Sequence, residues 1–216
     1  MGNLFSIDGP LYKISTVIYN LLVLNFLWLI FSIPFVTIGA STTALFYVTG
    51  KIVRQDNYNS LIKPFWHSFK TNFKQATLIW LTLLAGFMII FINIRNVHLL
   101  GGLGKYFAPF QFVILIELLI IGIYIFPLLA RYHIKFLDGI KAAFFIGNRH
   151  IITTILCLAV FPGMYFLLMW KGFFILFIMA IYSFWITYLL KDKFSRYAGT
   201  GEKTDYEELE DIEVTE

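Results

Sequence analysis

Long runs of apolar residues dominate the pattern of this chain. The first and longest run lies between Lys13 and Lys51, and none of its residues carries a charge. None of the runs shows the alternation of apolar and polar positions that is typical of strands. A helix needs about 20 apolar residues to cross a hydrocarbon core about 30 Å thick. The pattern therefore predicts five transmembrane helices, at about 14–33, 75–94, 107–130, 151–169 and 172–190.

The first apolar run is interrupted at its centre. Pro34 predicts the end of a helix, because the residue before a proline avoids the helical region, and Gly39 permits a turn. The following residues, 40–50, are rich in Ser and Thr. We expect them to form a short helix that starts within the membrane and leaves it on the cytoplasmic side. If they crossed the membrane instead, there would be six spans and a cytoplasmic N-terminus.

A basic amphipathic segment precedes the second predicted span. In a helix over residues 60–74, apolar side chains, mainly Phe, take one face, and a polar stripe takes the other. The stripe consists of Lys63, His67, Lys70 and Lys74. We expect this helix to lie at the cytoplasmic interface, where each cation adds about 1 kcal/mol of attraction to anionic lipid. Docking of a protein partner is the alternative role for the stripe.

The segment 131–150 predicts a similar interfacial helix before the fourth span. In it Gly139, Ala143 and Gly147 recur every fourth residue. Small side chains at this spacing allow two helices to approach closely. The three residues therefore predict a ridge for helix packing.

Composition and charge agree with a membrane protein. Of the 216 residues, 59% are hydrophobic and 14% are charged, against roughly 25% charged residues in soluble domains. Lys and Arg gather in 51–74, in 131–150 and after residue 190, flanking the apolar runs. This distribution indicates lipid rather than nucleic acid as the partner. It also places the C-terminus in the cytoplasm and, with five spans, the N-terminus outside.

The expected fold is an all-α, polytopic transmembrane helical bundle in the plasma membrane, with about five spans and cytoplasmic interfacial helices. It occupies residues 1–199. Residues 200–216 are strongly acidic and hold few bulky apolar side chains. Such a segment cannot bury enough surface to become ordered, so the sequence predicts a disordered cytoplasmic tail.

Glu117 is the only acidic residue inside a predicted span. An ionisable group at that depth is costly and is a functional hypothesis by default. Broken helices can also mark transport sites. We therefore predict a candidate intramembrane polar site that binds a proton, a cation or a polar solute. It consists of Glu117, Thr37, Gly39, Ser41, Thr42 and Thr43. The alternative is that Glu117 and the break at Pro34 serve helix packing alone.

The sequence gives no positive support for an enzyme. The single cysteine, Cys157, lies in an apolar run, and the four histidines show no metal-ligand spacing. No nucleophile–base pair and no paired carboxylates appear within reach of each other in the predicted fold. We therefore expect no catalytic residues, no metal and no cofactor.

Three segments carry a family resemblance: GPLYK at 9–13, SIPFVTIGASTTALFYVTGKIVR at 32–54, and FWHSFKTNFKQATLIWL at 65–81. Together they resemble the YesL family of bacterial membrane proteins, which is carried largely by Firmicutes and defined as a domain of unknown function. The resemblance provides no catalytic residues. Because family members often lie beside genes for carbohydrate ABC transporters and glycan utilisation, it implies a role near sugar uptake.

Three functional hypotheses follow. In the first, the protein is a non-enzymatic accessory component of carbohydrate uptake that binds an ABC-transporter permease or a membrane sensor. In the second, it is a small carrier or channel that uses the glutamate near the middle of its span. In the third, it is a structural or lipid-organising protein whose only partner is the bilayer.

Overall fold

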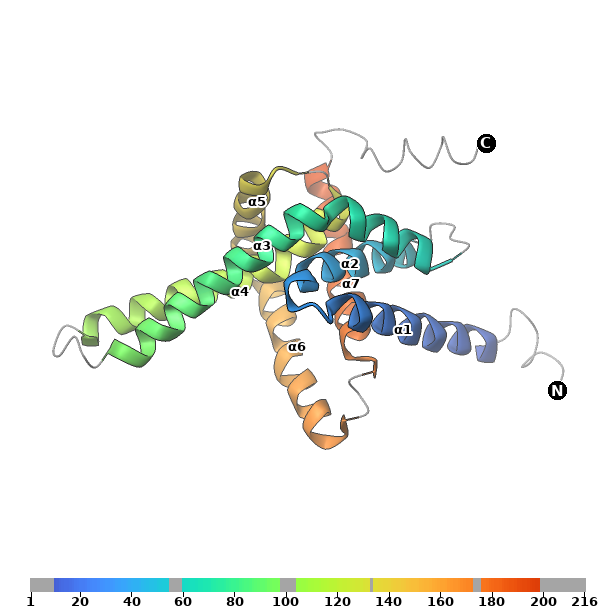
Figure 1. The fold of residues 1–216 in the computed structure, drawn as a ribbon, viewed down its shortest axis with the longest axis horizontal. Coiled ribbons are helices and arrows are strands. Elements are labelled where there is room, and N and C mark those ends of the chain that lie inside the picture. The colour runs from blue at the N-terminus through green and yellow to red at the C-terminus, as the bar shows by residue number, and fades with distance from the viewer. Residues whose placement is uncertain (1–9, 55–59, 98–103, 133, 173–175, 199–216) are drawn as a thin grey trace.

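The computed structural model describes residues 10–54, 60–97, 104–132, 134–172 and 176–198 (Figure 1). All regular secondary structure in these ranges is helical, which confirms the expected all-α fold. The helices are α1 (Pro10–Ser32), the short 3-10 helix η1 (Phe35–Thr37), α2 (Ile38–Arg54), α3 (Ile62–Asn96), α4 (Gly104–Arg131), α5 (Phe136–Arg149), α6 (Ile151–Trp170) and α7 (Ile178–Ala198). The predicted acidic tail lies outside the described residues.

Helix α2 is the central helix of the molecule. Every residue from Gly39 to Lys51 is buried, because α1, α3, α4 and α7 pack around it. The expected helix over 40–50 is present but longer than predicted, and its position in the membrane stays a prediction. The helix has 17 residues and is about 26 Å long. Its Ser and Thr side chains face other helices, where small and polar residues favour close packing.

Helix α3 joins two elements that the sequence analysis separates. It runs without a break over 35 residues, so the segment 60–74 and the span 75–94 are one helix, about 52 Å long. We expected the apolar face of its first half to lie on lipid, but part of this face packs against protein, while Ile62 and Phe73 are exposed. Phe65 and Phe69 are buried and pack on the ring of Phe31 in α1, with ring centroids 5.6 and 4.9 Å apart.

Five helices in the described ranges are long and apolar enough to cross a membrane. Four of these helices correspond to predicted spans, and they lie at 15–32, 62–96, 109–131 and 151–170. The fifth consists of η1 and α2, at 35–54. The structure thus supports a multi-pass membrane protein. The fifth predicted span, 172–190, corresponds to a shorter apolar helix that begins only at Ile178.

The late start of α7 has a clear physical cause. The side-chain oxygen Oδ1 of Asn25 accepts hydrogen bonds from the backbone N–H groups of Met179 and Ala180, at 3.1 and 3.2 Å. The first N–H groups of a helix have no partner within the helix. Asn25, which is fully buried in α1, therefore caps α7 from a distant part of the chain and fixes where this helix begins.

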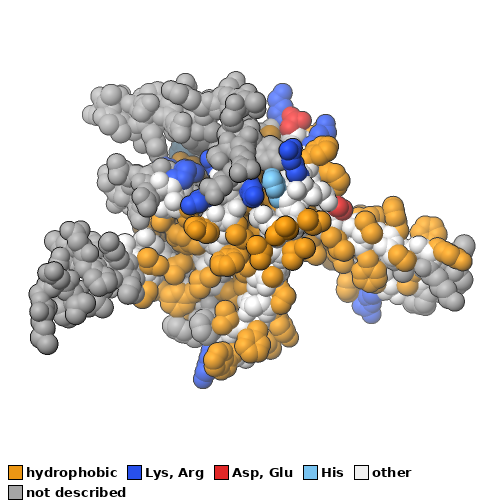
Figure 2. Space-filling model, turned by 180° about the vertical axis from the view of Figure 1, so that it is seen from behind, with side chains coloured by type: hydrophobic (Ala, Val, Ile, Leu, Met, Phe, Trp, Pro, Cys, Tyr) orange, Lys and Arg blue, Asp and Glu red, His pale blue; other side chains and the backbone are white. Residues whose placement is uncertain are grey.

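The helices diverge from a common centre. In Figure 1, α1, the pair α3–α4 and α6 point away from the region of α2 in three directions. Figure 2 shows most Lys and Arg side chains on one side of the molecule, above a broad belt of hydrophobic side chains. This segregation is the one that an interface between water and lipid requires.

Candidate functional site

The hydroxyl groups around the α1–α2 junction hold the junction together. The Oγ atoms of Ser32 and Ser41 are 2.6 Å apart, and Nε1 of Trp28 donates to Oγ1 of Thr42 at 3.1 Å. The hydroxyl of Thr37 donates to backbone oxygens of Phe31 and Pro34. These bonds connect the end of α1 to the start of α2 across the break at Pro34.

Two more predicted members of the polar site, Gly39 and Thr43, also have packing roles. Thr43 donates to the backbone oxygen of Gly39 at 2.9 Å, within its own helix. Gly39 lies directly against α3. A Cβ atom at this position would lie 2.7 Å from Cβ of Trp80 and would also collide with the backbone oxygen of Ala76. Only glycine fits where α2 and α3 approach this closely.

Glu117 has a partner that the sequence analysis missed. Nδ2 of Asn148, on α5, donates to Oε2 of Glu117 at 3.1 Å. Glu117 is half-buried and Asn148 is exposed, so the pair lies at the edge of the α4–α5 contact. The hydroxyl cluster bonds instead to α1 and to its own helix. The described hydrogen bonds therefore do not join the predicted polar site into one unit.

The predicted ridge of small residues lies against α4. Ala143 is fully buried, and a Cβ atom at Gly139 would lie 3.1 Å from Cδ1 of Ile125. A Cβ atom at Gly147 would collide with the side chain of Ile120. Nearby, the hydroxyls of Tyr124 and Thr154 are 2.8 Å apart, and Thr154 donates to the backbone oxygen of Gly147 at 2.7 Å. This network connects α4, α5 and α6.

The polar stripe on α3 is exposed along its whole length. Lys63, His67, Lys70 and Lys74 all lie on the surface. The Nζ of Lys70 lies over the ring of Trp66, 4.8 Å from its centroid, an arrangement in which the ring attracts the cation. The stripe thus remains available to lipid or to a partner.

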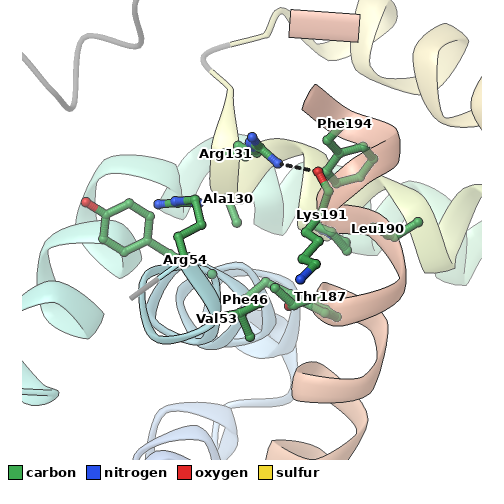
Figure 3. A pocket seen from close by; sticks show the side chains of 12 residues that line it. Phe46, Val53, Arg54, Ala130, Arg131, Thr187, Leu190, Lys191 and Phe194 are labelled. Atoms are coloured by element: carbon green, nitrogen blue, oxygen red, sulfur yellow. Dashed lines mark hydrogen bonds between the residues drawn. The ribbon is translucent and has the colours of Figure 1, made fainter. Parts of the chain in front are cut away.

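A pocket that the sequence analysis did not anticipate lies between α2, α4 and α7 (Figure 3). The space between its side chains measures about 410 Å³, part of it open to solvent. Three of the lining residues are cations and none is acidic. The lining residues are Phe46, Tyr47, Gly50, Val53, Arg54, Pro127, Ala130, Arg131, Thr187, Leu190, Lys191 and Phe194.

The cations of this pocket come from three different helices. Nη1 of Arg131 donates to the backbone oxygen of Lys191 at 3.3 Å, which ties α4 to α7. Tyr132, which follows α4, donates to the backbone oxygen of Phe194 at 3.0 Å. Burial raises the pKa of the Tyr132 hydroxyl, and the charges of Arg131 and Arg54 act in the opposite direction. Because the three cations are far apart in the sequence, no short sequence motif predicts the pocket.

The chemistry of these groups favours packing and binding. Within the described ranges, His, Cys, Asp and Glu side chains form no group of three or more that could hold a metal ion. Cys157 is buried. The described features are a hydroxyl cluster, a carboxylate–amide pair, an exposed basic stripe and a cationic pocket.

The fold and these features define a multi-pass, all-α membrane protein. A family model described as "Protein of unknown function, DUF624" matches residues 21–94. The match confirms the resemblance to the YesL family, which is the DUF624 family. The matched residues cover most of α1, all of α2 and nearly all of α3, and so include the hydroxyl cluster and Gly39. No curated protein and no solved structure matches the chain.

Proposed function

We propose that the protein is a non-enzymatic accessory component of the plasma membrane that binds another membrane protein of carbohydrate uptake or utilisation. The observation that carries this proposal is the α3–α4 limb, the second half of α3 together with the first half of α4. The limb projects away from the central helix (Figure 1). Ile89 on α3 is 60% exposed and Phe110 on α4 is 64% exposed.

Lipid can cover the apolar side chains of this limb. Its amide groups need hydrogen-bond partners, which a protein supplies and lipid tails do not. Asn93 is exposed on α3. On α4, the buried Oε1 of Gln111 has no hydrogen-bond partner. In a bilayer, amide side chains form hydrogen bonds across helix–helix contacts. The limb therefore offers a partner helix apolar surface and the exposed amide of Asn93, whereas the oxygen of Gln111 is buried within the chain. The link to carbohydrate rests on what the family resemblance implies about neighbouring genes.

A growth and uptake experiment tests this function. In the native host, deletion of the gene is expected to lower uptake of one labelled oligosaccharide and to leave glucose uptake unchanged. The wild-type chain should restore uptake, and it should co-purify in mild detergent with the permease of that sugar or with its membrane sensor. Normal uptake of every sugar in the panel, with only lipid recovered alongside the protein, would contradict the proposal.

A paired set of variants tests the limb itself. Asn93→Leu removes the exposed amide and keeps the surface apolar, so recovery of the partner is expected to fall. Thr82→Ala is the matched control, because Thr82 is exposed on the same helix but donates to its own backbone at Leu78, at 2.9 Å. If the amide variant retained the partner as well as the control does, the limb would not be the binding surface.

A carrier or channel remains the second candidate, and Glu117 is the feature that favours it. Glu117 is half-buried, and the amide of Asn148 donates a hydrogen bond to it. A carrier should move solute or protons alone in proteoliposomes. Glu117→Gln should then abolish the flux, although the amide oxygen can still accept the bond from Asn148. An accessory component should show no such flux. A lipid-organising protein should show neither flux nor a specific protein partner.

A further inference from the structure

We propose that the pocket between α2, α4 and α7 is a binding site for a phosphate group. A phosphodiester in the headgroup of an anionic phospholipid and free inorganic phosphate share this chemistry. Nothing in the functional proposal above depends on this site. The pocket lies in the C-terminal parts of its three helices, at the end of the molecule that the charge distribution assigns to the cytoplasm.

The charges of the pocket are the first reason. Arg54, Arg131 and Lys191 line one space, and no Asp or Glu is among the lining residues (Figure 3). The planar guanidinium group of arginine presents paired N–H donors that match two oxygens of a phosphate, and lysine adds a point charge. Basic pockets between transmembrane helices on the cytoplasmic side are the sites where phospholipid headgroups bind.

The placement of the two arginines is the second reason. Arg131 is held by its bond to the backbone oxygen of Lys191, so one part of its guanidinium is fixed. On α2, a Cβ atom at Gly50 would lie 3.4 Å from Nη1 of Arg54. The guanidinium of Arg54 therefore folds back along α2 and lies next to Gly50, where a larger side chain would crowd it.

The remaining walls of the pocket are mainly apolar. They include Phe46, Leu190 and Phe194. Thr187 contributes a hydroxyl, whose Oγ1 is 3.3 Å from that of Thr49. The pocket is small and partly open to solvent, so it suits a phosphate group better than a large solute.

A simpler explanation for the cations is that each one complements the negative end of its own helix dipole. That effect is local to each helix and does not require the three side chains to share one pocket. It also predicts no preference for an anionic ligand over a neutral one. A binding experiment therefore separates the two explanations.

The experiment uses the full chain in mild detergent and measures binding by native mass spectrometry. The probes are dihexanoyl phosphatidylglycerol, dihexanoyl phosphatidylcholine and inorganic phosphate. Lys191→Gln is the main variant, because it keeps the backbone oxygen that Arg131 binds. Lys70→Gln is the matched control, since it removes one equal charge from the exposed stripe on α3. Arg131→Lys keeps the charge and removes the paired donors.

We expect phosphatidylglycerol to bind more tightly than phosphatidylcholine. Lys191→Gln and Arg131→Lys should each weaken phosphatidylglycerol binding by about tenfold, as the loss of a charge-assisted hydrogen bond implies, whereas Lys70→Gln should have little effect. If inorganic phosphate leaves the lipid bound, the ligand is the headgroup. If inorganic phosphate itself binds and depends on Lys191, the ligand is free phosphate. Equal losses in Lys191→Gln and Lys70→Gln, or no binding of either anion, would overturn the assignment.

Discussion

Gly39 offers the sharpest test of how the central helix is held. It lies in the Ile-Gly-Ala-Ser stretch of the family-like segment, where α2 crosses α3. In Gly39→Ala, the new methyl group would meet the backbone oxygen of Ala76 and the Cβ of Trp80, 2.7 Å away. Neither atom belongs to the flexible end of a side chain. The two helices must therefore move apart, or the substituted residue must distort.

The expected magnitude is the difference of two effects. Overpacking in a tight contact costs about 1–3 kcal/mol, and we take about 3 kcal/mol because the obstacle is largely backbone. Replacing a helical glycine by alanine contributes about 1 kcal/mol in the other direction. The net loss of unfolding free energy is therefore about 2 kcal/mol. For a chain of this size, that corresponds to a fall in Tm of about 4–8 °C.

The assay is thermal unfolding in detergent, followed by intrinsic fluorescence. Gly163→Ala is the matched control, because Gly163 also lies within a helix, α6, and a Cβ atom there would have no neighbour within 4 Å. This control should gain helix propensity without a clash, so its Tm should stay constant or rise by about 2–4 °C. Equal shifts in the two variants, in either direction, would refute the assignment of Gly39 to a backbone contact.

Three further predictions follow. Asn25→Leu leaves two N–H groups at the start of α7 without their acceptor, so the unfolding free energy should fall by about 2 kcal/mol or more. Asn25→Asp keeps an acceptor oxygen and should lose less stability in the same thermal assay. The Tm of Glu117→Gln should lie within about 1 °C of that of the wild type, because the amide oxygen still accepts the hydrogen bond from Asn148. Glu117→Leu should lose about 1 kcal/mol of unfolding free energy. Equal Tm values for the two variants would show that this hydrogen bond is incidental. Single cysteines introduced at positions 57 and 203 should be protected from a membrane-impermeant reagent in intact cells, whereas cysteines at positions 3 and 101 should react. Protection of position 3 would contradict five crossings.

The sequence predicts the outward-facing helices of this protein better than its central one. The predicted spans 107–130 and 151–169 agree closely with α4 and α6, since much of their surface is exposed and their apolar pattern is uninterrupted. Helix α2 is misjudged because its Ser, Thr and Gly residues lower its hydropathy while facing protein. Such residues are favoured at helix contacts within membranes, so polarity in a sequence does not by itself mark a site.

Long-range partners account for the other differences. The start of α7 depends on Asn25, which the local sequence around Ile178 does not reveal. The partner of Glu117 is Asn148, on helix α5, which packs against α4. The cationic pocket needs three helix ends to meet. In each case the chemistry is visible in the sequence as single residues, and only the fold brings them together.

The packing of α2 against α3 bears on how many times the chain crosses the membrane. Helix α2 is long and apolar enough to cross, yet its packing argues for another position. Gly39 lies against Ala76 and Trp80, and the chain then runs back to the start of α3 at Ile62. Helix α2 therefore lies alongside the half of α3 that carries the exposed basic stripe. If α2 crossed the hydrocarbon core, those lysines would face lipid at the same depth, at a cost of about 2.5–3.5 kcal/mol each at the centre. We propose from this cost that α2 lies near the cytoplasmic interface, which would leave five crossings and place the N-terminus outside.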